Sequence, residues 1–245
     1  NLTLDVYNNS SNNLLLNVPI ASTYGYSTQL QNIGRTSNKG FEFNLSALVV
    51  STKDFTWNAS LNMAFNRNTV EALGVNQASF FPAASWGVSG QPTDYIAKVG
   101  EPVGAMFGLV ADGFYRTSDF DWNSTTGVYT LKAGVVNNSN IIGPVQPGSI
   151  KYKDLNGDGV IDVNKDRQII GNPNPKFTGG LNNQFTYKNW DMSVFVNFVY
   201  GNTIYNANKV ELTNGYTNNA NMLDVMAGRW KTVDENGNVD RKSVV

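Results

Sequence analysis

In the stretch FEFNLSALVVSTKDFTWNASLNMAFN, residues 41–66, apolar and polar residues alternate on both sides of a break at 51–54. Such alternation places the two kinds of side chain on opposite faces of a β-strand. An ordinary strand has about 5–6 residues, whereas a tilted strand that crosses a bilayer needs about 9–11. Both arms are therefore long enough to span a membrane. Their apolar positions are Phe41, Phe43, Leu45, Ala47, Val49, Phe55, Trp57, Ala59, Leu61, Met63 and Phe65.

Residues 177–200 repeat this design around a turn at Lys188 and Asn189. The polar positions are mostly Asn, Ser, Thr and Gln rather than Lys and Glu, which suits the wet lumen of a barrel. Aromatic residues gather near the strand ends, where the membrane interfaces of a barrel lie. The side chains expected to face lipid are Leu45, Val49, Phe55, Leu61, Leu181, Met192, Val194 and Val196. Those expected to face the lumen are Asn44, Ser46, Asn58, Ser60, Asn62, Asn182 and Gln184.

The composition excludes several classes of function. The 245 residues include 18 Lys and Arg against 19 Asp and Glu, so no basic patch predicts nucleic-acid binding. The absence of Cys and His removes thiol chemistry, His-based triads and the usual zinc ligands, and we expect no enzymatic activity. No apolar run reaches about 18 residues, so no transmembrane helix is expected, and no signal peptide stands at Asn1.

The connections between the expected strands alternate between long and short. A strand at 2–7 is followed by a long loop up to Lys39, and the segment 67–176 separates the two hairpins, whereas the turns at 51–54 and 188–189 are tight. Outer-membrane barrels alternate short periplasmic turns with long extracellular loops in this way. Since the smallest barrels have about 8 strands, the five expected here indicate a fragment of a longer chain.

The long connections are expected to be folded, because structureless loops of such length are uncommon. Strand-like pieces occur at 105–115, 127–132 and 149–153, and the segment 203–230 favours short helices. The expected organisation is barrel strands with one extracellular loop in 1–66, a folded extracellular part in 67–176, a barrel hairpin in 177–200 and an extracellular loop in 201–245.

The segment DLNGDGVIDVNKD, residues 154–166, is typical of a calcium loop of the EF-hand or dockerin kind. Oxygen ligands at positions one, three and five, a Gly at six, a carbonyl at seven and an acid at nine suit a hard cation. Position twelve departs from the pattern, because Lys165 stands there and the acid follows it. A metal-free turn rich in Asn and Asp is the alternative. The candidate ligands are Asp154, Asn156, Asp158, the carbonyl of Val160, and Asp162 or Asp166.

Other candidate residues lie in the loops. Asp112, Asp119 and Asp121 are expected to be solvated acids rather than a glycosidase pair. The run Asn172-Pro173-Asn174-Pro175 predicts a stiff entry to the following strand. Exposed aromatic residues could stack on sugar rings or grip a peptide, although such residues more often pack loops together. These residues are Tyr24, Tyr26, Phe80, Phe81, Trp86, Tyr95 and Trp122.

Several stretches, in order and spacing along nearly the whole chain, resemble the C-terminal part of the SusC/RagA family of TonB-dependent outer-membrane transporters. They are LLLNVPI at 14–20, NIG at 32–34, NKGFE at 38–42, VGEPVG at 99–104, DGF at 112–114, PGSIKYKD at 147–154, DGVID at 158–162 and IGNPNPKF at 170–177.

The resemblance implies an all-β chain that is part of a large antiparallel transmembrane β-barrel, with about 22 strands in the whole family member. It implies import of a glycan or peptide across the outer membrane of a Gram-negative bacterium. The implied partners are membrane lipid, a SusD-like surface lipoprotein that closes over the barrel, and the TonB complex, which acts on a plug domain outside this chain. The alternative is a secreted calcium-binding β-sandwich, an adhesin or glycan-binding module, whose apolar residues would be buried between two sheets.

Overall fold

The structure is a computed structural model that describes residues 1–20, 23, 25–26, 28–74, 77–82, 93–213 and 221–228. The chain divides into two compact units. Unit 1 comprises Asn1–Ala84, Tyr95–Met106 and Gly171–Ile204, and unit 2 comprises Ser85–Asp94, Phe107–Ile170 and Tyr205–Val245. None of the helices among the described residues combines the length and the apolar character that a membrane crossing requires.

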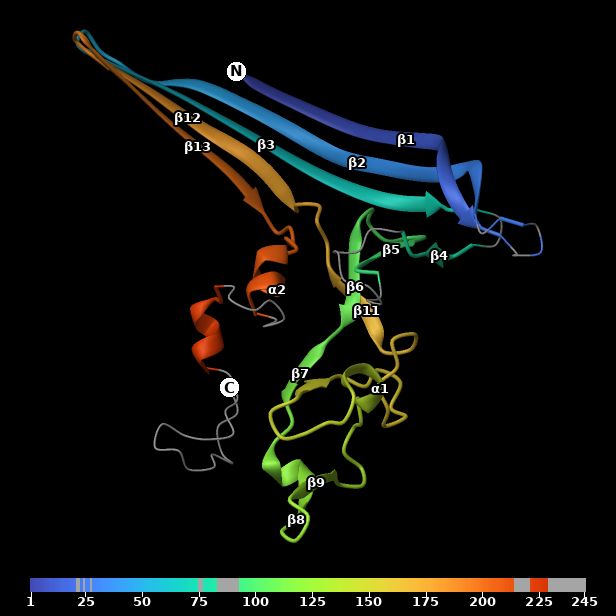
Figure 1. Ribbon diagram of the computed structural model, residues 1–245. Helices are drawn as coiled ribbons and strands as arrows, with labels where there is room; N and C mark the ends of the chain where they lie inside the picture. The colour runs from blue at the N-terminus through green and yellow to red at the C-terminus, as the bar shows by residue number, and fades with distance from the viewer. Residues whose placement is uncertain are drawn as a thin grey trace. The chain divides into compact units, whose positions relative to one another are not determined.

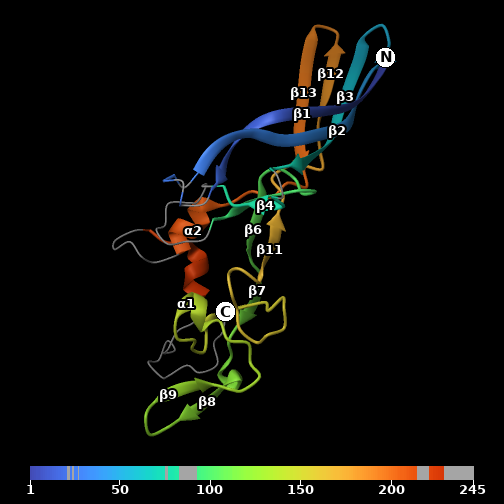
Figure 2. The ribbon, with the colours of Figure 1, turned by 90° about the vertical axis from the view of Figure 1, so that its right-hand side faces the viewer.

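Unit 1 is built on one antiparallel sheet of five long strands in the order β1–β2–β3–β12–β13 (Figure 1). The turns that follow β2 and β12 lie at the same end of this sheet (Figures 1 and 2), where the amide of Lys188 donates to the carbonyl of Asp54 at 2.8 Å. The predicted strands 41–50, 55–66, 177–187 and 190–200 are confirmed. The observed bounds are β1 (Leu2–Pro19), β2 (Thr28–Ser51), β3 (Phe55–Ala72), β12 (Phe177–Tyr187) and β13 (Trp190–Tyr200).

The predicted strands were too short at the end away from these turns. The long loop expected between Tyr7 and Lys39 is wrong, because β1 continues to Pro19 and pairs with β2. Similarly, β3 runs to Ala72 rather than to residue 66. From Asn8 to Asn13 of β1 every side chain is Asn or Ser, so this part of the strand is polar on both faces. A strand segment with no apolar face shows no alternation, so the sequence pattern missed it.

The strand register gathers like side chains into rows that cross all five strands. One row on the apolar face consists of Leu2, Leu45, Leu61, Leu181 and Val196. The next row, on the other face, consists of Thr3, Asn44, Asn62, Gly180 and Asn197.

These rows confirm that the two predicted sets of side chains lie on opposite faces. The apolar face is open: Leu2 is 70% exposed and Leu45 42%. This differs from the β-sandwich alternative, in which these residues would be buried. A β-bulge between Leu48 and Val50 places Val50 rather than Val49 opposite Trp57.

Aromatic rings form two clusters on the apolar face. Near the turns the rings of Phe55 and Phe185 stack with centroids 6.4 Å apart, and at the other end those of Phe41 and Phe65 stack at 4.4 Å. Phe55 and Phe65 are ten residues apart, or about 34 Å along the strand, and a tilt of about 40° reduces this to about 26 Å across a bilayer. The spacing matches an apolar band of about 25 Å between two aromatic girdles. The turn-side cluster is Phe55, Trp57, Phe185, Tyr187 and Trp190, and the far cluster is Phe41, Phe65, Phe177, Phe198 and Tyr200.

The far end of the sheet in unit 1 is covered by smaller elements. Strand β4 (Ser79–Phe80) pairs with β5 (Tyr95–Lys98), and β5 pairs with the start of β6 (Ala105–Leu109). The loop after β5 is tied to β3, because Gly100 donates to the carbonyl of Val70 at 2.8 Å and Val70 donates back to Glu101 at 2.9 Å. These bonds hold β5 over the end of β3.

Unit 2 is a set of short elements around a small core. Its elements are β7 (Ala111–Phe114), η2 (Thr117–Asp119), β8 (Phe120–Asn123), β9 (Val128–Leu131), α1 (Ser139–Ile142), β10 (Ile150–Tyr152), most of β11 (Arg167–Gly171), α2 (Ala207–Thr213) and η3 (Asp224–Gly228). Tyr115, Ile161 and Asn138 are fully buried, and Phe120 packs edge-on against Tyr115 at 5.8 Å. The predicted strand pieces and short helices are confirmed, whereas β8, β11 and α1 were not predicted.

Candidate functional site

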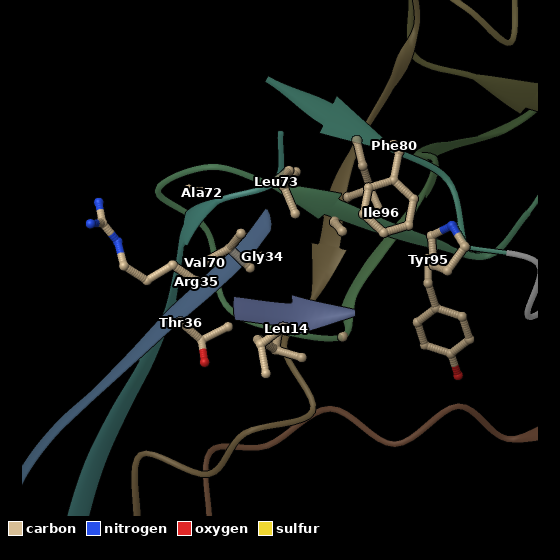
Figure 3. A pocket seen from close by; sticks show the side chains of 14 residues that line it. Leu14, Gly34, Arg35, Thr36, Val70, Ala72, Leu73, Phe80, Tyr95 and Ile96 are labelled. Carbon is tan, nitrogen blue, oxygen red and sulfur yellow. The ribbon is translucent and has the colours of Figure 1, made fainter. Parts of the chain in front are cut away.

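An apolar cavity of about 440 Å³ lies at the far end of the sheet in unit 1 (Figure 3). Thr36 of β2 pairs with Val70 of β3, and alternation places both on the polar face that carries Asn44 and Asn62. The cavity is therefore on the face expected to line the lumen. The guanidinium of Arg35 points away from it (Figure 3). The principal lining residues are Leu14, Val70, Leu73, Phe80, Tyr95 and Ile96.

The chemistry of this cavity favours an apolar ligand group. Val70, Leu73 and Ile96 are only 3–5% exposed and form a packed wall, while Phe80 and Tyr95 add aromatic rings. Water in an apolar cavity has few hydrogen-bond partners, so an apolar group that displaces it gains free energy. A ligand pocket of this kind is usually apolar with a few convergent polar groups.

An amide cluster lies nearby on the same face. The Oδ1 of Asn38 accepts hydrogen bonds from the Nδ2 atoms of Asn66 and Asn68 at 3.3 and 2.9 Å, and the Oδ1 of Asn68 accepts from the amide of Val103 at 3.0 Å. Amide side chains offer donors and acceptors to sugar hydroxyls and to peptide backbones. The cavity and the amide cluster together provide an apolar and a polar surface.

The predicted calcium loop in unit 2 has the local turns that the sequence indicated. Gly157 and Gly159 have φ angles of +76° and +81°, and their amides donate to the two carboxylate oxygens of Asp154 at 2.7 Å each. Asp166 is fully buried, and its oxygens accept from the amides of Leu155 and Asp162 at 2.9 and 2.7 Å. Backbone amides therefore occupy one bonding position on each of these oxygens.

The charge of Asp158 is balanced within the loop. Its carboxylate lies 3.2 Å from the ammonium of Lys165. The pKa of Asp158 is lowered, chiefly because the amide of Val160 donates to it, with further bonds from Asn156 and Lys165. Since the folded pKa is depressed, these bonds stabilise the loop near neutral pH and are lost as the pH falls through the lowered value.

The acids of the loop do not meet at one point. Among the described residues no group of three acidic or other metal-binding side chains converges on a position that could hold a metal ion. Asp154, Asn156, Asp158, the Val160 carbonyl, and Asp162 or Asp166 remain the oxygen donors that the sequence pattern indicates, and calcium binding stays a prediction.

We expect calcium to draw these donors together and to slow proteolysis within 154–166 of the full-length protein. Asp154→Ala should remove the effect, because it deletes the ligand at position one. Asp121→Ala is the matched control, since Asp121 is an exposed acid outside the loop. Limited proteolysis with calcium and with a chelator measures the difference. Equal cleavage in both conditions would show that the loop is held by its amides and Lys165 alone.

The other predicted residues are dispersed. Asp112 of β7 and Asp121 of β8 are exposed, as expected of solvated acids, although they lie in short strands rather than in loops. Asp119 of η2 is part-buried and accepts a hydrogen bond from the amide of Arg116 at 2.8 Å. Asn174 stiffens the entry to β12, since its Nδ2 donates to the carbonyl of Val103 at 2.9 Å.

Of the aromatic candidates, Phe80 and Tyr95 line the cavity. Tyr26 is 74% exposed and Phe81 46% exposed, and the ring of Trp122 lies 4.4 Å from that of Tyr129. Tyr24 and Trp86 lie outside the described residues.

Most of the cavity was missed by sequence reasoning. Its wall residues Leu14, Val70, Leu73 and Ile96 come from four distant segments, and each is unremarkable in its own segment. One signal was present at Val70, an apolar residue at a position that alternation assigns to the polar face.

Comparison with known proteins gives a consistent result. The chain is 32% identical over 243 residues to TonB-dependent receptor P3 of Formosa agariphila, covering 99% of this chain and 22% of the relative. It is 27% identical over 229 residues to TonB-dependent receptor SusC of Bacteroides thetaiotaomicron, covering 89% of this chain and 20% of the relative. The fold superposes on the structure of the RagAB peptide transporter with a TM-score of 0.66 and 18% identity, over 100% of this chain and 24% of that chain. No family model matches.

The open sheet, with one apolar face and two aromatic clusters, has the fold of the wall of a large outer-membrane transporter barrel, and the barrel is not closed within this chain. The chain belongs to the SusC/RagA family of TonB-dependent transporters. It spans about a fifth of the length of the curated relatives that it matches.

Proposed function

We propose that the protein containing this chain imports a nutrient across the outer membrane of a Gram-negative bacterium in a TonB-dependent manner. The observation that carries this proposal is the five-stranded sheet, whose apolar face and aromatic clusters are spaced for a bilayer, in a chain similar to TonB-dependent receptors along nearly its whole length. Coupling to the TonB complex belongs to a plug domain elsewhere in the protein.

The orientation follows from the connections. The tight turns at 51–54 and 188–189 fit the periplasmic rim, where outer-membrane barrels have short turns. The segments 67–176 and 201–245 then lie at the cell surface. A SusD-like lipoprotein is the partner proposed to cover this side.

The cargo is a glycan or a peptide, and the apolar cavity supports a peptide that carries an apolar side chain. A sugar presents hydroxyl groups on most of its surface, and burial of these groups beside Leu73, Ile96 and Phe80 without hydrogen bonds is costly. The amide cluster at Asn38, Asn66 and Asn68 suits the peptide backbone.

Uptake by whole cells tests this function. Cells should take up fluorescent oligopeptides that contain Leu or Phe, and loss of TonB should abolish uptake. Tyr95→Ala removes an aromatic wall of the cavity, and because burial of a large apolar group contributes about 1.5–3 kcal/mol, a partial loss should raise the half-saturating concentration about 3- to 10-fold.

Tyr187→Ala is the matched control, since Tyr187 belongs to the turn-side cluster and is 52% exposed. Uptake that persists without TonB would contradict the importer. Uptake of oligosaccharides that is insensitive to Tyr95→Ala would contradict the peptide cargo and the role of the cavity.

A further inference from the structure

We propose that unit 1 binds the phosphate group of an outer-membrane lipid at the level of the far aromatic cluster, through Lys39, Arg67 and a polar cavity beside Arg67. This inference rests on the outer-membrane location proposed above. Lys39 and Arg67 lie on the outward face of the sheet, opposite to the face that carries the apolar cavity. The polar cavity lies at the edge of β3 and is also lined by Asn66 and Asn68 of the amide cluster.

Two cations lie directly opposite each other at this level. Lys39 of β2 and Arg67 of β3 are register partners, and both are exposed. Lys39 stands two residues before Phe41, and Arg67 stands two residues after Phe65, so both cations lie on the face of this stacked pair. On the other side of Lys39, its partner on β1 is the uncharged Asn8.

No carboxylate in the described part of the chain forms an ion pair with either cation. Like charges directly opposite each other destabilise paired strands. Within the described ranges the one ion pair joins Lys165 to Asp158, so no described carboxylate lies within 4.0 Å of Lys39 or Arg67. A bound anion would relieve this repulsion, and a guanidinium with a neighbouring ammonium suits the oxygens of a phosphate group.

A polar cavity of about 340 Å³ adjoins Arg67. It opens where β3 and β12 separate, beyond their last register pair, Ala64 with Thr178. Arg67 and Lys176 line it together with one acid, Glu101, so cations outnumber anions in its wall. The charge of the cavity is therefore complementary to an anion.

The surroundings select a lipid over a free anion. Toward the turns, the same face continues with exposed apolar side chains, including Leu4 at 65% and Val6 at 78%, the latter opposite Phe41. An aromatic girdle marks the interface of the hydrocarbon region, so the first cations beyond it lie at the level of the headgroups. A ligand with a phosphate at one end and acyl chains at the other matches both surfaces.

Lipid binding to the purified full-length protein in detergent tests the inference. The probes are lipid A with a single phosphate, the same lipid after removal of the phosphate, and inorganic phosphate. We expect phosphorylated lipid A to bind about tenfold more tightly than the dephosphorylated form, because one charge-assisted hydrogen bond to the phosphate accounts for a difference of this size. The double variant Lys39→Gln with Arg67→Gln should lose this preference.

The matched control is Lys53→Gln with Lys188→Asn, which removes two exposed cations from the opposite rim and should keep the preference. A variant with Lys39→Arg and Arg67→Lys, which exchanges the two cations, should keep it as well. Equal binding of the two lipids, an unchanged preference in the double Gln variant, or displacement of the lipid by inorganic phosphate at equal concentration would overturn the inference. Because binding is measured in detergent, a protein that binds the lipid but imports nothing would refute only the proposed function.

Discussion

Arg in place of Leu61 is expected to lower the free energy of unfolding by about 2–4 kcal/mol, whereas Arg at the adjacent Asn62 should have a much smaller effect. Leu61 is the middle residue of the apolar row and lies between the two aromatic clusters of β3, close to the midplane of the band. A charged side chain there must enter hydrocarbon or move toward an interface. Asn62 points to the opposite face, where water solvates the guanidinium.

Urea unfolding of the full-length protein in lipid vesicles measures both variants. Both variants introduce Arg, at consecutive positions of the same strand. The difference between their losses of unfolding free energy therefore reports which face of the sheet each position lies on. Equal losses of stability at Leu61 and Asn62 would contradict the assignment of the two faces. A larger loss at Asn62 would reverse it.

Tyr115→Ala is expected to destabilise unit 2 by about 3–5 kcal/mol, the range for removal of a large buried aromatic side chain. Tyr115 is fully buried, its ring packs against Phe120, and its hydroxyl contacts the side chain of Asn138 and the carbonyl of Val136, the latter at 2.6 Å. Asn138 is also fully buried, and its Nδ2 donates to the carbonyl of Ile150 at 2.8 Å. The hydroxyl and amide therefore link separate segments of this unit.

Tyr115→Phe separates these contributions. It keeps the ring but leaves Asn138 without one partner, and should cost about 1–3 kcal/mol. Trp122→Ala is the control, since Trp122 is 40% exposed, and should cost less than either. Hydrogen exchange of the full-length protein should show faster exchange in 107–170 for Tyr115→Ala, with the long strands unchanged. Unaltered exchange in unit 2 would show that this core does not hold the unit together.

The sequence predicted the long strands, because their two faces have different surroundings and the residues therefore alternate between apolar and polar. Lipid on one face and water on the other enforce alternation from Phe41 to Phe65, and the hairpin 177–200 was predicted to the residue. The same constraint is missing from Asn8 to Asn13, where every side chain is Asn or Ser, and the apolar residues that follow, Leu14 to Leu16, are consecutive and do not alternate, so the extension of β1 was not visible. Short elements such as β8 and α1 depend on tertiary contacts rather than on periodicity.

The candidate site was less predictable than the strands. The residues Leu14, Val70 and Ile96 meet only because β5 folds over the end of β3, and that arrangement depends on the backbone bonds of Val70 with Gly100 and Glu101. No local pattern encodes such long-range bonds. The loop at 154–166 shows the opposite case, because its spacing of acids and glycines predicted the local turns, while the place of Lys165 beside Asp158 required coordinates.

In the proposed importer this sheet is part of the barrel wall, and a nitroxide scan along residues 57–65 of β3 examines that placement. Single spin labels in the full-length protein, reconstituted in lipid, report their accessibility to oxygen, which concentrates in hydrocarbon, and to a water-soluble nickel complex. If β3 has one face in lipid and one in water, oxygen accessibility peaks at Ala59, Leu61 and Met63, while nickel accessibility peaks at Ser60 and Asn62. Two outcomes would contradict this placement of β3. Oxygen and nickel accessibility could rise and fall at the same residues, or neither could alternate from one residue to the next.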